Sequence, residues 1–254
     1  MKKIYYALLI LILLVSGCTA KPTPEVEESY VIGLDDTFVP MGFRDANNEL
    51  VGFDVELANA VSELTGMQFS FQPIDWSLKE TELNQGNIDM IWNGYSITDA
   101  RKEMVGFSTP YMQNRQIVVV LADSTIETVA DLAGMVVSVQ KDSSALEAVT
   151  AQADVLASFK NSEVLQFDSN VDLFVDLEAG RSNAIILDEI FADYTIKLRN
   201  PSGYKVLAED FGSEEYGIGF RKDDTELQTK INEALQTLID NGTFDEIKAN
   251  WFND

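Results

Sequence analysis

The sequence of 254 residues contains no histidine and one cysteine, Cys18. Without histidine, the chain lacks the usual base of a catalytic triad and the commonest metal ligand in proteins. With one cysteine, it cannot form an internal disulfide or a thiolate metal cluster. We therefore expect no metal, no cofactor and none of the common hydrolase mechanisms.

Basic residues are also scarce: 18 Lys and Arg stand against 42 Asp and Glu, which gives a formal net charge of -24. So large a negative charge repels phosphate groups, so nucleic acid and anionic lipid headgroups are poor partners. The charge favours solubility, but it does not identify a ligand.

The amino terminus has the features of a removable targeting segment. Two lysines precede the twelve apolar residues Ile4–Val15, which are too few for a stable membrane span of about 20 residues. Val15-Ser16-Gly17-Cys18 resembles a bacterial lipobox, which implies that Cys18 carries the lipid and becomes the first mature residue. We expect a signal peptide over 1–17, a flexible lipidated tether over 18–29, and a position at the extracellular face of the membrane.

From Tyr30 onward, apolar strand-like runs alternate with helical ones, which predicts an α/β fold of mostly parallel sheets flanked by helices. We expect two crossings, near 111–115 and 212–216, that divide the chain into lobe 1 (30–112 and 216–254) and lobe 2 (113–215). The expected strands are 30–34, 67–72, 88–92, 116–121, 135–139, 164–167, 184–187 and 214–220, and the expected helices are 55–64, 128–134, 170–179, 189–197, 225–241 and 243–251.

The most informative stretch follows the apolar run 88–92, which we expect to end before Gly94. Hydroxyls come next on alternate residues, Ser96 and Thr98. Thr98 is expected to cap a helical turn that directs Arg101 back over the carboxyl end of the strand, where open α/β sheets bind ligands. Hydroxyls and a guanidinium at that place suit a carboxylate.

This stretch, Gly94-Tyr95-Ser96-Ile97-Thr98-Asp99-Ala100-Arg101 and then Phe107-Ser108-Thr109-Pro110-Tyr111, resembles the extracellular solute-binding proteins of polar amino acid ABC transporters (bacterial family 3). The resemblance implies a two-lobed, periplasmic-binding-protein-like (type II) fold that binds a free amino acid between its lobes and delivers it to permease subunits. A second similar motif, Gly52-Phe53-Asp54-Val55-Glu56-Leu57-Ala58, is interpreted as structural, with Asp54 as the helix N-cap.

The resemblance also assigns roles in the site. Phe38 and Trp76 would enclose the ligand side chain, and Asp35 could hold a cationic one. Asp188, directly after a strand, would pair with the α-ammonium, although it could also cap the next helix. The complete expected set of ligand-binding residues is Asp35, Phe38, Trp76, Asn93, Gly94, Ser96, Arg101, Ser143, Ser144 and Asp188.

Two other functions compete with a monomeric binding protein. An enzyme similar to cyclohexadienyl dehydratases could use the same fold, since fold alone does not fix function. The absence of histidine and the length of about 225 residues after the tether argue against it. A sensor domain would need a downstream transmembrane segment, which we do not expect. The ligand stays open among basic amino acids, glutamine and cystine.

Overall fold

The computed structural model describes residues 29–252. The expected signal peptide, Cys18 and all but the last residue of the expected tether lie outside this range. Within it, every helix is too short or too polar to cross a membrane.

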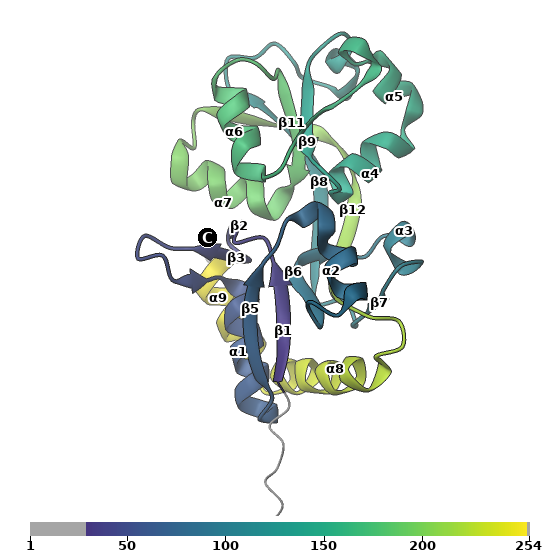
Figure 1. Cartoon of the computed structure of the whole chain (residues 1–254). Coiled ribbons are helices and arrows are strands. Elements are labelled where there is room, and N and C mark those ends of the chain that lie inside the picture. Colours follow the sequence, from purple (N-terminus) through teal and green to yellow (C-terminus); the bar gives the residue numbers. More distant parts are fainter. Residues whose placement is uncertain (1–28, 253–254) are drawn as a thin grey trace, which may run out of the picture.

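The main sheet has nine strands in the order β10-β9-β11-β8-β12-β6-β1-β5, with β7 beside β12. Two parallel groups, β5-β1-β6 and β10-β9-β11, are joined by β8 and β12, which run antiparallel to each other. Figure 1 shows these two long strands connecting an upper and a lower lobe. The strands are β1 (Ser29–Leu34), β5 (Gln68–Pro73), β6 (Met90–Ser96), β7 (Gly106–Phe107), β8 (Met112–Leu121), β9 (Val137–Gln140), β10 (Leu165–Phe167), β11 (Ala184–Asp188) and β12 (Tyr204–Phe220).

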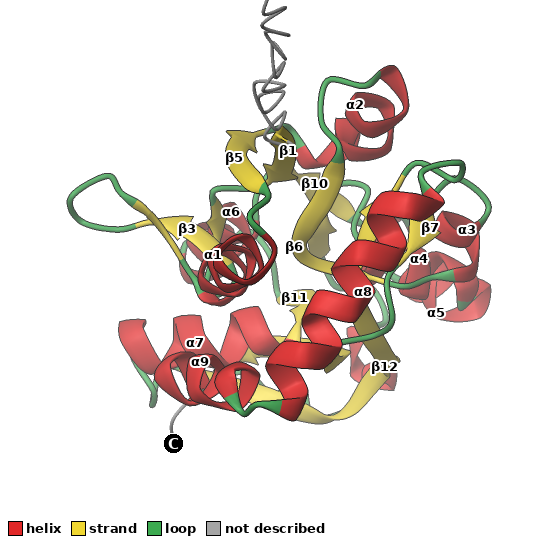
Figure 2. Cartoon of the chain, turned by 90° about the horizontal axis from the view of Figure 1, so that it is seen from below, coloured by secondary structure: helices red, strands yellow, loops and turns green. Residues whose placement is uncertain are grey.

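Helices flank both groups of strands. In the lower lobe they are α1 (Phe53–Thr65), α2 (Lys79–Gln85), α3 (Asp99–Lys102), α8 (Thr225–Asp240) and α9 (Thr243–Phe252). In the upper lobe they are α4 (Ser144–Ala151), α5 (Ala153–Ser158), α6 (Asn170–Glu178) and α7 (Glu189–Arg199). Figure 2 shows α8 crossing the underside of the lower lobe, where its apolar face is buried.

Shorter elements complete the described chain. A small sheet of β2 (Thr37–Phe38), β3 (Gly42–Arg44) and β4 (Leu50–Val51) lies beside the lower lobe. Three 3₁₀ turns are η1 (Trp76–Leu78), η2 (Val129–Leu132) and η3 (Lys160–Ser162). The expected helix over 128–134 is thus only the turn η2, which Thr128 and Asp131 close as a capping box.

The prediction for 214–220 covered only the lower end of β12. The strand begins at Tyr204 and pairs with β8 from Tyr204 opposite Leu121 to Tyr216 opposite Met112. Its upper half carries two register shifts, which interrupt the alternation of apolar and polar residues that identifies a strand. The two lobes therefore share one continuous sheet through β8 and β12.

The prediction that the strand ends before Gly94 was wrong. β6 continues to Ser96, because β12 pairs with it there: Tyr216 lies opposite Ser96 and Gly217 opposite Tyr95. Pairing with β12, which comes from a distant part of the chain, therefore extends β6 beyond the point at which the local sequence predicted its end.

Asp54 is not the N-cap of α1. The cap residue is Gly52, and the first helical N–H groups, from Phe53 and Asp54, already donate to the carbonyls of Pro40 and Met41. The carboxylate of Asp54 is therefore free to accept hydrogen bonds elsewhere. It accepts from the Gly94 N–H at 2.7 Å and from the Tyr111 hydroxyl at 3.1 Å.

This buried carboxylate fixes the backbone of β6 at Gly94. Burial raises the pKa of Asp54 to about 7, because the charged form is poorly solvated in the interior. The family-like motif around Asp54 is structural, as expected, but it acts by holding β6 rather than by capping a helix.

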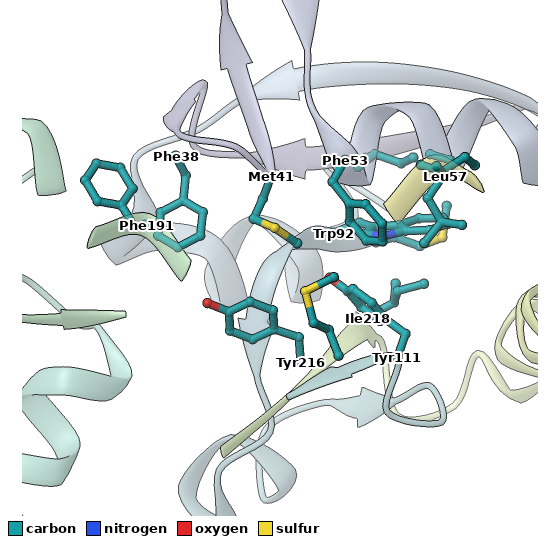
Figure 3. Packing of buried hydrophobic residues seen from close by; sticks show 14 of the residues in the cluster. Phe38, Met41, Phe53, Leu57, Trp92, Tyr111, Phe191, Tyr216 and Ile218 are labelled. Carbon is teal, nitrogen blue, oxygen red and sulfur yellow. The ribbon is translucent and has the colours of Figure 1, made fainter. Parts of the chain in front are cut away.

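The largest apolar cluster extends through both lobes. Figure 3 shows the rings of Phe38 and Phe191 side by side, and their centres are 5.4 Å apart. Phe38 belongs to β2 below and Phe191 to α7 above. Such a contact across the lobes removes apolar surface from water and favours the closed arrangement seen here.

Candidate functional site

A small cavity of about 10 Å³, enough for about one water molecule, lies between the lobes in this arrangement. Its walls contain eight of the ten residues expected from the sequence, together with Gln140, a residue that the sequence did not indicate: Phe38, Trp76, Gly94, Ser96, Arg101, Gln140, Ser143, Ser144 and Asp188. Residues from the ends of β6, β9 and β11 thus meet at one place, as expected for the carboxyl ends of parallel strands.

Arg101 provides the positive charge of the pocket, and its side chain is about 1% exposed. The Thr98 hydroxyl accepts from the Arg101 N–H at 3.2 Å, so the predicted cap of α3 is confirmed. The guanidinium donates to the Ser96 carbonyl at 3.0 Å and lies 4.6 Å from the centre of the Tyr95 ring. These contacts fix the plane of a group that suits two-pronged binding of a carboxylate.

The Nε atom of Arg101 is buried and has no hydrogen-bond partner within residues 29–252. The nearest carboxylate oxygens are those of Glu147 at 3.3 Å and Glu80 at 4.0 Å. The hydrogen-bonding capacity of the guanidinium is therefore only partly used by the protein, which leaves donors for a ligand.

Asp188 provides a buried negative charge on the facing lobe. It occupies the N-cap position of α7 but makes no side-chain capping bond, so the competing cap interpretation is wrong. Instead, its Oδ1 accepts from Asn114 Nδ2 at 2.5 Å and from the Tyr216 hydroxyl at 2.6 Å. Burial, and after it the negative charge of Glu214, raise the pKa of Asp188 to about 7.

Asp35 does not line the pocket, although it makes a contact between the lobes at its edge. Its Oδ1 accepts from the Thr37 N–H and hydroxyl at 2.9 and 2.6 Å, and its Oδ2 accepts from Gln140 Nε2 at 3.1 Å. Burial raises the pKa of Asp35. In this arrangement Gln140 donates a hydrogen bond to Oδ2 of Asp35, the oxygen to which a cationic side chain of the ligand would bind.

Asn93 lies behind the pocket. Its side chain is about 1% exposed, and its Oδ1 accepts from the Asp35 N–H at 3.0 Å. It therefore holds the loop that carries Asp35 and Phe38, and it does not line the pocket.

The turn before α4 is capped by a serine side chain and contains a residue in the left-handed conformation. Ser143 caps the helix, accepting from the Leu146 N–H at 3.2 Å. Asp142 has a φ of +51°, a left-handed conformation that glycine would adopt more easily. Its carbonyl accepts from Arg101 Nη2 at 3.3 Å and from Lys79 Nζ at 2.9 Å, so this turn joins the two lobes.

Lys79 was missed by the sequence analysis. Its sequence context, Lys79-Glu80-Thr81-Glu82, is typical of a solvated helix, yet the side chain is about 2% exposed and lies 5.1 Å from the Trp76 ring centre. Burial, together with the positive charge of Arg101, lowers the pKa of Lys79 to about 8.

Phe38 and Trp76 are both pocket walls and core residues. Phe38 is about 5% exposed and Trp76 about 8%, and the Trp76 ring meets the Tyr95 ring edge-on at 5.9 Å. The two rings therefore pack in the core and line the pocket at the same time.

Three polar residues on the connecting strands were also missed: Asn114, Gln116 and Glu214. Asn114 and Gln116 alternate on one face of β8, and both are buried. Their spacing of two, which places both amides on one face of the strand, was the signal that could have identified them, although Gln113 and Arg115 on the other face are polar as well. No group of side chains that could hold a metal ion occurs within residues 29–252.

Comparison with known proteins identifies the family. The model of bacterial extracellular solute-binding proteins, family 3, matches residues 30–254. The chain belongs to this family.

Individual relatives match this chain over most of their own length. The chain is 31% identical to the arginine-binding extracellular protein ArtP of Bacillus subtilis over 228 residues, covering 89% of this chain and 87% of ArtP. It is 29% identical to the L-cystine-binding protein TcyJ of Escherichia coli over 224 residues, covering 87% and 82%.

A solved structure is similar as well. The substrate-binding protein of an ABC uptake transporter from Streptococcus pneumoniae, solved with bound histidine, has a TM-score of 0.87 and 39% identity, covering 89% of this chain and 93% of that one. The expected two-lobed type II fold is thereby confirmed, and the family is one of binding proteins.

Gly94 offers a test of how tightly the pocket is built. Its φ is +54°, and a Cβ there would lie 2.9 Å from the Phe38 ring and 3.1 Å from the Tyr216 ring. Gly94→Ala should therefore destabilise the fold by about 2–4 kcal/mol, the sum of a left-handed alanine and an overpacked core. Gly86→Ala is the matched control, because Gly86 has a φ of +77° but no atom within 4 Å of its Cβ position. Urea unfolding should show a smaller loss of about 1–2 kcal/mol for the control; equal losses would mean that the rings are not held against Gly94.

Proposed function

We propose that this family member is the substrate-binding component of an ABC importer that captures a basic L-amino acid between its lobes and delivers it to permease subunits. The observation that supports the proposal most directly is a buried guanidinium, Arg101, and a buried carboxylate, Asp188, on opposite lobes and in the walls of one pocket. A free amino acid carries the complementary pair, a carboxylate and an ammonium.

The placement of these charges couples binding to closure. Arg101 follows β6 in the lower lobe, and Asp188 ends β11 in the upper lobe. We propose that the lobes comprise 30–112 with 216–254, and 113–215, and that they turn about β8 and β12. Both ends of a zwitterion are then satisfied only when the lobes meet, so a ligand shifts the equilibrium toward the closed form.

A basic side chain suits the remaining charges. With Asp188 assigned to the α-ammonium, Asp35 at the edge of the pocket is the carboxylate proposed for a basic side chain, which would replace Gln140 at its Oδ2. The aromatic rings of Phe38 and Trp76 favour a neighbouring cation. The arginine-binding and histidine-binding relatives support the same class. Cystine, which one relative binds, and glutamine are the alternative ligands. Calorimetry with free amino acids distinguishes them from a basic amino acid.

Calorimetry with free amino acids tests the function. We expect L-arginine, L-lysine or L-histidine to bind more tightly than L-glutamine and L-cystine, and L-glutamate to bind least, because its side chain would face like charges. A ligand at 100 times its dissociation constant should also raise the free energy of unfolding by about 2.7 kcal/mol. The proposal includes no catalysis, so ligand recovered unchanged after hours with the protein is the expected result. Preference for glutamate would contradict the ligand class.

We further propose that the mature protein is a monomer anchored by a lipid on Cys18, at the extracellular face of the membrane. The motif Val15-Ser16-Gly17-Cys18 supports the anchor, and the family comprises extracellular proteins. Cys18→Ala should release a protein of unchanged ligand affinity from the cell envelope, because the lipid and not the fold supplies the anchor. Retention of the variant in the membrane fraction would contradict this.

Arg101 should read the carboxylate of the ligand. Arg101→Lys should weaken L-arginine binding by several kcal/mol, on the order of the 2–5 kcal/mol seen when one partner of a buried charge pair is removed, because an ammonium cannot reproduce the two-pronged contact. L-Argininamide lacks the carboxylate charge, so it should bind much more weakly than L-arginine to wild type and lose little more in the variant. If wild type binds L-arginine and L-argininamide equally well, Arg101 does not bind the carboxylate of the ligand.

A further inference from the structure

Glu214 accepts hydrogen bonds from polar groups where the connecting strands β8 and β12 pass between the lobes. It lies on β12 directly opposite Asn114 of β8. Its Oε1 accepts from Ser96 Oγ at 2.5 Å, from Asn114 Nδ2 at 2.6 Å and from Gln116 Nε2 at 2.9 Å. Ser96 is itself a wall of the pocket, so Glu214 lies directly behind the ligand position.

Glu214 and Asp188 form a pair of carboxylates. The same Asn114 amide donates to both, at 2.5 Å to Asp188 Oδ1 and 2.6 Å to Glu214 Oε1. Like charges this close disfavour the doubly ionised state unless a cation lies between them. A proton on Asp188, whose pKa is raised by burial and by the charge of Glu214, relieves that repulsion when no ligand is bound.

A separate observation points to the same cluster, because it contains a buried acceptor without a donor. Gln116 is about 1% exposed, and its Oε1 accepts no hydrogen bond from any residue between 29 and 252. Its amide nitrogen donates to Glu214, so the unused oxygen belongs to the same cluster. Glu214 Oε2 likewise accepts no hydrogen bond in the described chain, and Glu214 is partly exposed. A buried acceptor without a donor is costly, and an ammonium has three donors to offer.

We propose that Glu214 is a ligand-binding residue: Asp188, Glu214 and the side-chain carbonyl of Gln116 together receive the α-ammonium of the amino acid, which displaces the proton held by Asp188. The protonated pair and R–NH₃⁺ give the ionised pair bound to R–NH₃⁺, and one H⁺ passes to the solvent. The proposal rests on the proposed function and assigns a second carboxylate to the same site.

The other charged groups around Asp188 and Glu214 do not cancel the rise in the pKa of Asp188. The positive charge of Arg101 lowers the pKa of Asp188, but less than burial and the charge of Glu214 raise it. Tyr216, which faces Asp188 from β12, has a pKa well above its ordinary value, so its hydroxyl stays a donor. Ser96, Ser144, Asn114 and Gln116, the remaining groups around Glu214, are uncharged.

The sign of the pH dependence follows. Below about pH 7 the unliganded pair holds a proton that the bound form has lost. The affinity for L-arginine should therefore rise with pH up to about 7 and then level off. Binding should release close to one proton at pH 6 and almost none at pH 8.

Calorimetry with L-arginine at pH 5.5, 6, 7 and 8, each in two buffers of different ionisation enthalpy, measures affinity and proton release together. Glu214→Gln keeps the hydrogen-bonding shape but removes the charge. It should bind at least tenfold more weakly than wild type at pH 8 and nearly equally at pH 5.5, and it should release much less than one proton at pH 6. Glu214→Asp should restore part of the proton release.

Glu215→Gln is the matched control, because Glu215 is exposed on the neighbouring position and its carboxylate bonds to Gln113. It should behave as wild type. If Glu214→Gln loses affinity equally at every pH with unchanged proton release, Glu214 only supports the fold of the site and the proposal is overturned. Wild-type affinity in Glu214→Gln overturns it as well. Failure of wild type to bind any amino acid would instead refute the proposed function.

Discussion

The buried guanidinium of Arg101 is the constraint on which the site depends. Its charge is removed from water, which is costly unless polar groups replace the lost hydration. The protein supplies two carbonyls, from Ser96 below and Asp142 above, and an aromatic face from Tyr95. Because one carbonyl comes from each lobe, the same group that attracts a carboxylate also connects the two halves of the molecule.

Several apparently separate features serve that arrangement. The Asp54 carboxylate fixes the Gly94 backbone, two residues before the Ser96 carbonyl. The Thr98 cap begins the turn from which Arg101 projects. The left-handed Asp142 presents its carbonyl to Arg101 and to Lys79 at once. The two buried cations share this carbonyl, and carboxylates of Glu147 and Glu80 lie 3.3 Å from Arg101 Nε and Lys79 Nζ, respectively, so the protein itself balances much of their charge.

Most elements within each lobe could be predicted from the sequence because their apolar residues follow the period of a strand or a helix, but the short helices α2 and α5 and the small sheet β2–β4 were not predicted. The site residues on loops could be predicted because polar side chains stood at strand ends. What could not be predicted depended on distant pairing: β6 is extended by β12, Asp54 is released from capping by carbonyls of another loop, and Lys79 is buried by the opposite lobe. In each case the local sequence pattern predicted a different arrangement, and a contact with a distant part of the chain decided the one observed.

The connecting strands carry more than a hinge. Asn114, Gln116 and Glu214 turn polar groups inward where β8 and β12 pass between the lobes, next to Asp188 at the end of β11. Closure brings the Ser96 and Ser144 hydroxyls within 3.0 Å of each other beside these carboxylates. Negative charge is then concentrated in a space from which water is being removed, so closure without a cation is opposed and closure around one is favoured. If the lobes turn about β8 and β12 as proposed, the same strands also respond to whether the pocket is filled.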